Sequence, residues 1–298
     1  MRLFSSEERI SKQIEEEGVG DGTVHMKSRA PLNIALTTMT FITGILIVLI
    51  IWTITAWYVN EYISVVMKFP YPWDSIIWVW DSFTTQKIVN GHTMMEHTLA
   101  SLKRVFIAFI ASAMVGVTLG VILGYFNRIY SVGIIPVTVF QTIPGLAWLP
   151  IALLLFGLGD DAAIFIIFSV STMVITINVS GGIRTMPPVV TRAAGMMGAN
   201  GIIMFFKILV PYSAVTIING LRLGMGSAWR VLIAAEMLIA TGLGLGSTME
   251  FMRENFPDNI AAFGCIVVIV IIGLIIDKVI FSSIEKMVRH KLGMEEGF

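Results

Sequence analysis

The chain has 298 residues; 56% of them are hydrophobic, only 13% are charged, and the mean hydropathy is +0.83. Because a soluble domain carries about 25% charged residues, this composition predicts a membrane protein. The formal net charge is zero, which argues against a nucleic-acid partner bound through counterion release. The single cysteine, Cys265, can form no intramolecular disulfide, and its apolar surroundings predict a packing role.

Residues 1–30 are polar and carry charges of both signs. A secretory signal would need a short apolar core within this region, and none is present. We therefore expect residues 1–30 to form a solvated cytoplasmic tail.

Six apolar segments follow, and a helix needs about 20 such residues to cross the hydrocarbon core of a bilayer. The sequence therefore predicts an all-α membrane protein with about six transmembrane helices. Residues 59–95 hold tyrosines, tryptophans and prolines that favour the headgroup zone, which predicts an outer interfacial connection. The six predicted spans are residues 33–58, 105–126, 134–158, 162–181, 208–240 and 260–276.

The second predicted span carries a stripe of small residues. Gly116, Gly120 and Gly124 are spaced four apart on one helical face, and Ala108 and Ser112 extend that face. Since small side chains let helices approach closely in lipid, we expect this face to contact a neighbouring helix.

The third predicted span contains Pro136, Pro144 and Pro150, which free backbone carbonyl groups. In a bilayer such groups must face protein or water, so the span is expected to be broken and to form a cavity wall, although packing by other helices would satisfy the same groups. Gln141 and Thr142 lie beside the break and, with Pro144, are candidates to line a translocation path.

The fifth predicted span carries Arg222, Arg230 and Glu236. An ionisable group inside a membrane costs at least about 2.5 kcal/mol unless it is paired or faces water. Arg230 and Glu236 are six residues apart, too far around the helix for a simple pair, so each needs a partner elsewhere or a place near a helix end. A role in a translocation path and a structural bridge between helices remain equal alternatives.

Signs of enzymatic chemistry are absent from the sequence. It contains no Gly-Lys pair and hence no phosphate-binding P-loop. Asp160 and Asp161 are expected to form a turn. Among the scattered histidines only His92 and His97 are close, at a spacing that does not share a helical face, so neither a metal site nor a cofactor is expected.

A partly polar segment over residues 191–211, TRAAGMMGANGIIMFFKILVP, interrupts the apolar runs. Pro187 and Pro188 precede it and should end the previous helix near Met186. Its apolar residues recur at helical spacing, which predicts a short amphipathic helix outside the bilayer, held between two spans. Lysine and arginine concentrate at the termini and around this segment, which predicts that all three are cytoplasmic.

This segment resembles the cytoplasmic loop of ABC importer permeases of the binding-protein-dependent type. The pattern of that loop is Glu-Ala-Ala, three residues, Gly, nine residues, Ile, any residue, Leu-Pro. The segments at 97–105, 141–159 and 219–238 look like the nitrate/sulfonate/taurine class, and the resemblance covers roughly residues 92–290. The residues in register with the loop pattern are Ala193, Ala194, Gly198, Ile208 and Pro211, with Val210 in the leucine place.

The resemblance implies a type I ABC importer permease fold, with a permease core over residues 96–285 and a cytoplasmic tail over 286–298. A coupling helix over about 191–207 would dock on a cytoplasmic ATPase through Arg192 and the residues in register. ATP and magnesium would bind to two copies of that ATPase and not to this chain. The protein would lie in the inner membrane. Its other partners would be a second permease copy, which gives a homodimer, an extracytoplasmic substrate-binding protein and membrane lipid.

The same resemblance implies a small, anionic solute, such as a sulfonate, taurine, nitrate or bicarbonate, carried by alternating access. The path would run along the axis of the permease pair, lined in part by the broken third span and by the fifth span. One departure is Arg192, which stands where the family usually has glutamate and which suggests a compensating acid on the ATPase.

Two other functions fit parts of the sequence. A stand-alone, ion-coupled secondary transporter would use Glu236 as its coupling acid, but such proteins often show two inverted halves, and no second broken span corresponds to Pro144. An assembly scaffold without transport would need neither the prolines nor the charges inside the spans.

Overall fold

The computed structural model describes residues 30–63, 68–239, 242–255 and 259–292. The predicted N-terminal tail lies almost wholly outside these residues, as does the end of the C-terminal tail. The chain divides into two units, residues 1–51 and 52–298, each of which is described by itself. Five helices in the described part of the chain are long and apolar enough to cross a membrane, or six if one bent pair counts as a single span.

The first predicted span is confirmed as a helix. Helix α2 (Ala30–Tyr58) continues into a π-helical stretch, η1 (Val59–Ile63), and residues 39–63 have the length and hydropathy of a span. Within the first unit its large side chains are exposed, including Leu46, Ile47 and Val48. Such a surface suits contact with lipid chains.

The predicted outer connection contains a helix and a short hairpin. Helix α3 (Pro72–Thr84) follows, and a hairpin of β1 (Ile88–Val89) and β2 (His92–Thr93) turns at Asn90-Gly91 with positive φ at both positions, as a tight hairpin requires. Asn60 binds both the N–H and the carbonyl oxygen of Phe69 through its side chain, at 2.7 and 2.9 Å.

Helix α4 (Met94–Tyr125) begins about ten residues before the predicted span. Thr93 and Glu96 form a reciprocal capping box at its start, in which the Thr93 Oγ1 accepts from the Glu96 N–H and the Thr93 N–H donates to the Glu96 carboxylate. Lys103 and Arg104 lie inside this helix and not at its boundary. Arg104 is buried, and its charge is compensated by carboxylates. The helix can therefore continue past it without exposing the guanidinium group to water.

The predicted contact of the glycine stripe is confirmed. Gly116 and Gly120 of α4 meet Ile175 and Val179 of α7 (Asp160–Arg184), and a Cβ added to Gly120 would lie only 2.7 Å from the Val179 Cβ. Helix α7 also packs closely against α10 (Val210–Ile239). There Gly224 receives Ile175 and Gly220 receives Val179, so each of these two side chains lies between glycines of two helices.

The third predicted span is broken, as expected. Helix α5 (Asn127–Thr142) contains Pro136, and a 97° bend separates it from a 3₁₀ turn, η2 (Gly145–Trp148), and from helix α6 (Leu149–Phe156). Pro144 immediately precedes the turn, where its missing N–H cannot continue the ladder of α5.

The predicted amphipathic helix has different bounds from those expected. Helix α8 (Pro188–Met196) starts earlier than 191 and ends well before 207. Gly198 adopts a φ of +84°, which ends the helix, and α9 (Gly201–Met204) and the π-helical η3 (Phe205–Leu209) then run without interruption into α10. Pro211 therefore lies inside a long helix and does not start it.

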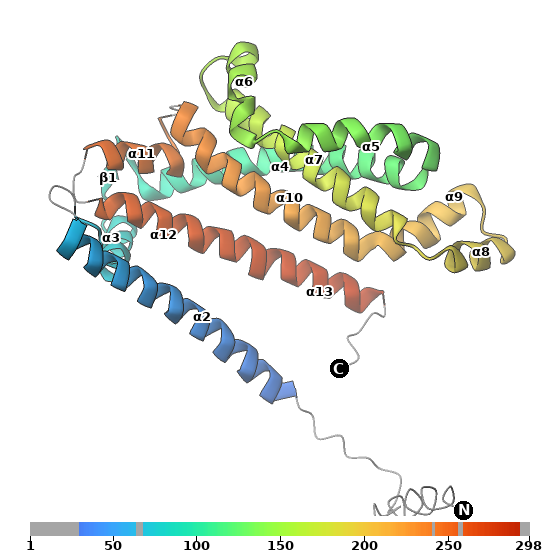
Figure 1. The fold of residues 1–298 in the computed structure, drawn as a ribbon, viewed down its shortest axis with the longest axis horizontal. Helices are drawn as coiled ribbons and strands as arrows, with labels where there is room; N and C mark the ends of the chain where they lie inside the picture. The colour runs from blue at the N-terminus through green and yellow to red at the C-terminus, as the bar shows by residue number, and fades with distance from the viewer. Residues whose placement is uncertain (1–29, 64–67, 240–241, 256–258, 293–298) are drawn as a thin grey trace, which may run out of the picture. The chain divides into compact units, whose positions relative to one another are not determined.

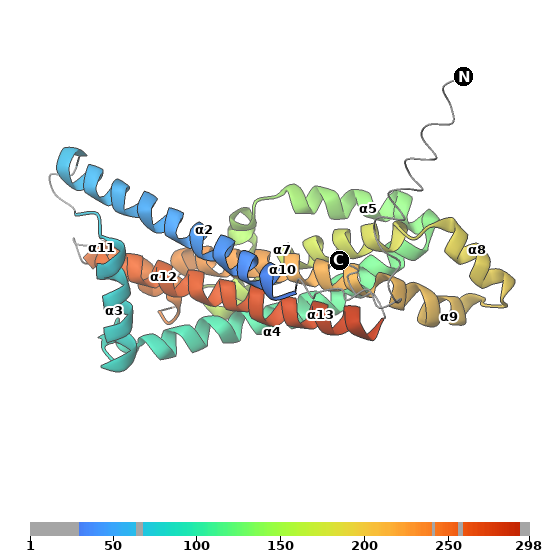
Figure 2. The same ribbon diagram turned by 90° about the horizontal axis from the view of Figure 1, so that it is seen from below.

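The C-terminal elements are α11 (Leu245–Asn255), α12 (Ile260–Leu274), the π-helical η4 (Ile275–Phe281) and α13 (Ser282–Lys291). The last three form one continuous helix, Ile260–Lys291, so the predicted sixth span extends into the basic segment. Within residues 52–298, α8 and α9 lie at one end of the bundle, whereas α3, α11 and the hairpin lie at the other (Figures 1 and 2).

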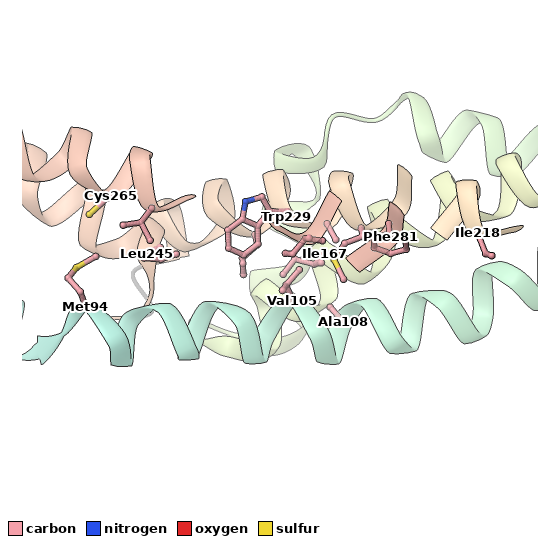
Figure 3. Packing of buried hydrophobic residues seen from close by; sticks show 14 residues of the cluster. Met94, Val105, Ala108, Ile167, Ile218, Trp229, Leu245, Cys265 and Phe281 are labelled. Carbon is pink, nitrogen blue, oxygen red and sulfur yellow. The ribbon is translucent and has the colours of Figure 1, made fainter. Parts of the chain in front are cut away.

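The largest apolar cluster lies where α4, α7, α10 and α12 meet (Figure 3). Trp229 of α10 is buried there and donates its indole N–H to the carbonyl oxygen of Ile269, at 3.2 Å. Cys265 is fully buried in the same cluster, which agrees with its predicted packing role.

Replacement of Gly120 by alanine tests the contact between α4 and α7. The added methyl group would overlap Val179, and we expect a loss of about 1–3 kcal/mol of stability, the usual range for overpacking. The measurement is the thermal unfolding midpoint of the purified protein in detergent. Gly181→Ala is the matched control, since nothing lies within 4 Å of a Cβ added there. Equal midpoints for the two variants would contradict the proposed contact.

Candidate functional site

Helix α8 exposes one face to solvent in this chain. Pro188 occupies its first turn, where no backbone N–H bond is needed, and the Ala199 N–H closes the other end by donating to the Ala194 carbonyl oxygen at 2.9 Å. Val189, Arg192 and Met196 lie at helical spacing and are all exposed, Met196 by 85%. An exposed row of this kind on a short, fixed helix is suited to contact another protein.

The structure distributes the predicted loop residues over three elements. Arg192, Ala193 and Ala194 lie on α8, with Ala194 buried and Arg192 exposed. Gly198 forms the turn that follows. The last two, Ile208 and Pro211, are half-buried in the long helix of η3 and α10. The spacing of the motif therefore matches a helix, a turn and the start of a span.

Glu236 is the centre of a buried ion-pair cluster. Its carboxylate accepts hydrogen bonds from the Arg104 Nη1 at 2.6 Å, from the Ser101 Oγ at 2.8 Å and from the Gly246 N–H at 2.9 Å. Arg104 is 4% exposed and Glu236 has no exposed surface. Arg104 also binds Asp160, at 2.8 Å from its Nε. The predicted need for a distant partner of Glu236 is confirmed, and the cluster joins α4, α7, α10 and α11.

Sequence reasoning missed two members of this cluster. The predicted span of 105–126 left Arg104 just outside it, and Asp160 was assigned to a turn, whereas Asp160 starts α7 and pairs with Arg104. One signal was available, because Ser101 and Arg104 are three residues apart and therefore share a helical face.

Two glycines allow the backbone to reach the Glu236 cluster. A Cβ at Gly244 would lie 2.6 Å from the Glu236 carboxyl carbon, and one at Gly246 would lie 2.4 Å from the carbonyl oxygen of Ile233. Gly244 also has a φ of +154°, which side chains rarely adopt.

His97 lies beside this cluster with both ring nitrogens in use. The Gly244 N–H donates to Nδ1 at 3.0 Å, so Nε2 carries the proton and donates to the Val89 carbonyl oxygen at 2.9 Å. No nitrogen of His97 is left for a metal ion. His92 lies near it, at 5.9 Å between ring centroids, and the described residues contain no group of three metal-ligating side chains.

A second ion-pair cluster lies near the middle of α10. The Arg222 Nε donates to Asp277 Oδ1 at 2.5 Å, and its Nη1 donates to Glu285 Oε2 at 3.4 Å. Glu285 also accepts from Arg289 at 2.9 Å. These contacts fasten α10 to η4 and α13. They confirm that Arg222 has a partner on another element and support the structural alternative for it.

Arg230 is different from the other two arginines because it is exposed. Its only interaction among the described residues is a long hydrogen bond of 3.4 Å to Ser227 Oγ. Gln141, Thr142 and Pro144 are also exposed, at the end of α5 and in the break that follows.

Taken together, a bundle of long apolar helices, a broken span and charged groups paired inside the bundle are the features of a multi-pass membrane protein. The model of the family "Binding-protein-dependent transport system inner membrane component" matches residues 116–290, more than half of the chain. The chain therefore belongs to this family, the permease subunits of ABC importers, and is a protein of the inner membrane.

Individual relatives agree with this family. The chain is 34% identical over 193 residues to an ABC transporter permease protein of Methanocaldococcus jannaschii, a match covering 65% of this chain and 72% of the relative. It is 36% identical over 192 residues to the nitrate import permease protein NrtB of Synechocystis sp., covering 63% and 68% of the two chains. It is 28% identical over 183 residues to the taurine transport system permease protein TauC of Escherichia coli, covering 61% and 66%.

A solved structure supports the type I importer fold. The MetNI methionine ABC transporter, in an inward-facing conformation, aligns with a TM-score of 0.56 at 19% identity, over 63% of this chain and 92% of its own. The relatives and this fold do not favour the secondary-transporter alternative. That alternative needs Glu236 as its coupling acid, whereas the Glu236 carboxylate is bound by partners in a buried cluster.

Substitution of the Glu236 cluster should produce non-additive losses of stability. Arg104→Met leaves the buried Glu236 carboxylate without a cation and should cost about 3–5 kcal/mol, whereas Glu236→Met leaves Arg104 paired with Asp160 and should cost less. The double variant removes both charges and should lose less than the sum of the single variants. Thermal unfolding midpoints in detergent measure all three. The control is Arg253→Met, which removes an exposed pair with Glu250 and should not shift the unfolding midpoint measurably. Additive losses of stability at 104 and 236 would argue against a buried pair.

Proposed function

We propose that this permease works as a homodimer with two copies of a cytoplasmic ATPase, which bind ATP and magnesium, and with an extracytoplasmic substrate-binding protein. The sequence has no P-loop, so nucleotide hydrolysis requires a separate subunit. The family description names a binding-protein-dependent system, which supports the outer partner. The observation that carries the proposal is the exposed face of α8, fixed between two long helices.

In this proposal α8 is the coupling helix, and its exposed face docks on the ATPase. Its position supports this role mechanically. Only three residues, Thr185 to Pro187, separate it from α7, and after the turn at Gly198 the chain enters the helix that continues through α10. Movement of α8 would therefore move α7 and α10 as rigid bodies, which a flexible loop could not do.

The cytoplasmic side is assigned from charge. Arg192 lies on α8, Arg184 and Lys207 flank it in the sequence, and the end of α13 is also basic, with Arg289 and Lys291. Both regions lie at the same end of the bundle in residues 52–298 (Figures 1 and 2). An excess of Lys and Arg marks the cytoplasmic side, so α8 and both termini are proposed to be cytoplasmic.

The substrate is proposed to be a small anion, such as a sulfonate, taurine, nitrate or bicarbonate. The names of the relatives, which refer to nitrate import and taurine transport, support this class. Gln141, Thr142 and Pro144 of the broken span, together with α10, are proposed to line its path by alternating access. Arg222 and Glu236 were candidates for the same path, but their ion pairs support a role in fastening helices.

Met196→Asp should disrupt the contact between α8 and the ATPase. A carboxylate on a docking face must be desolvated on binding, so we expect loss of co-purification with the ATPase encoded beside this chain, without a change in the unfolding midpoint. Met287→Asp on α13 is the matched control, since Met287 is also exposed and lies toward the same end of the bundle.

The proposal fails if both methionine variants retain the ATPase equally well. It also fails if the wild-type chain purifies alone and moves solute under an ion gradient without ATP. In that case Glu236 would become the candidate coupling acid.

Arg192→Glu tests the proposed acid on the partner. Because Arg192 stands where related permeases usually carry glutamate, reversing its charge should repel an acid on the ATPase and lower transport-coupled ATP hydrolysis several-fold. Hydrolysis is measured in reconstituted complexes, with Arg192→Gln as the intermediate variant. Unchanged coupling in both variants would mean that no compensating acid faces this residue.

A further inference from the structure

We propose that Arg230, at the level of the break between α5 and α6, is the residue that selects the substrate by charge inside the membrane. This inference rests on the proposed function as the permease of an importer for small anions. It assigns to the permease a part of the specificity that would otherwise belong to the binding protein alone.

The first argument compares three arginines that lie within long apolar helices. Arg104 is 4% exposed and is held by Glu236 and Asp160, and Arg222 is held by Asp277 and Glu285. Both guanidinium groups are therefore neutralised by carboxylates of the chain.

Arg230 has no acidic partner among the described residues, and its side chain is exposed. Its guanidinium remains charged at any physiological pH. An arginine facing hydrocarbon would cost at least about 2.5 kcal/mol, so the group needs water or an anion.

The second argument is the position of Arg230 along α10. The next residue, Val231, packs against the break in the third span, because a Cβ added to Gly145 would lie 2.9 Å from the Val231 Cγ2. The break therefore lies at the level of Arg230. Pro144 lacks an N–H, and the helical ladder is interrupted between Thr142 and Gly145.

Polar backbone at such a break is tolerated in a membrane only where it is buried in protein or lines a water-filled cavity. Gln141 and Thr142, at the end of α5, are exposed. An unneutralised cation and an exposed polar break thus occur at one level of the bundle, from two different parts of the sequence. A water-filled path at this level explains both features.

The chemistry of Arg230 determines which solutes this level would admit. A guanidinium group donates two parallel hydrogen bonds to the oxygens of planar or tetrahedral oxyanions, such as nitrate, bicarbonate and sulfonates. It also repels cations, as rings of arginine or lysine do in anion-selective pores. In a twofold dimer each copy would supply one such group. Arg230 is exposed and is one binding group in each copy. It would therefore hold an anion weakly enough for the anion to be released.

The test uses the full complex of permease, ATPase and binding protein in liposomes, with labelled nitrate and labelled taurine as probes. Arg230→Gln should reduce ATP-dependent uptake at least tenfold, Arg230→Glu should abolish it, and Arg230→Lys should retain it within a few-fold. Association with the ATPase and the oligomeric state should be unchanged in all three. Arg253→Gln, in the exposed pair on α11, is the control with wild-type uptake expected.

Three results would overturn the inference. One is wild-type uptake by Arg230→Gln. A second is dissociation of the permease pair in Arg230→Gln and Arg230→Glu, which would make Arg230 a bridge between copies. The third is a wild-type complex that binds the ATPase but transports neither nitrate nor taurine. That result would exclude these anions as substrates while leaving the importer function intact. Failure of the proposed function is distinct, because the wild-type chain would then not associate with the ATPase at all.

Discussion

The structure depends on the close approach of two helices, α4 and α10, to α7. Ile175 and Val179 of α7 each fit between two glycines, one on α4 and one on α10. Association of helices in lipid gains little from burying apolar surface, because the lipid chains are themselves apolar, so contact must come from close packing. Glycines on both neighbours provide that packing. The resulting trio of α4, α7 and α10 is the frame to which the other elements attach.

The polar groups of the bundle follow from this frame. Once α4 and α10 are held against α7, Arg104 and Glu236 can meet in the interior, and the backbone of Gly246 reaches the same carboxylate. Arg222 is held in a comparable way by the long C-terminal helix. These charged groups thus connect the central trio to α11 and α13. The two features proposed to act in transport, α8 and the break between α5 and α6, lie outside the trio.

The sequence predicted the features that depend on local pattern. The spans follow from the length of apolar runs, the contact of Gly120 from helical spacing, and the break from Pro144. Helix bounds were predicted less accurately. The apolar spacing continues across Gly198 and suggested one helix, whereas the positive φ of Gly198 ends the helical segment there. The partners of Arg104 and Glu236 could not be predicted, since they are 132 residues apart and meet only through the packing of α7.

The wide separation of these partners along the chain has a consequence for biosynthesis. The helix that carries Arg104 is made first, Asp160 follows 56 residues later, and Glu236 follows 132 residues after Arg104. A nascent α4 must therefore enter the bilayer with its arginine uncompensated, or wait beside the insertion machinery. Asp160 can pair with Arg104 as soon as α7 has been synthesised, before α10 exists. The acid at the start of α7 is thus the first counterion available during assembly, and Glu236 completes the site only when the fourth of the five long helices has been inserted.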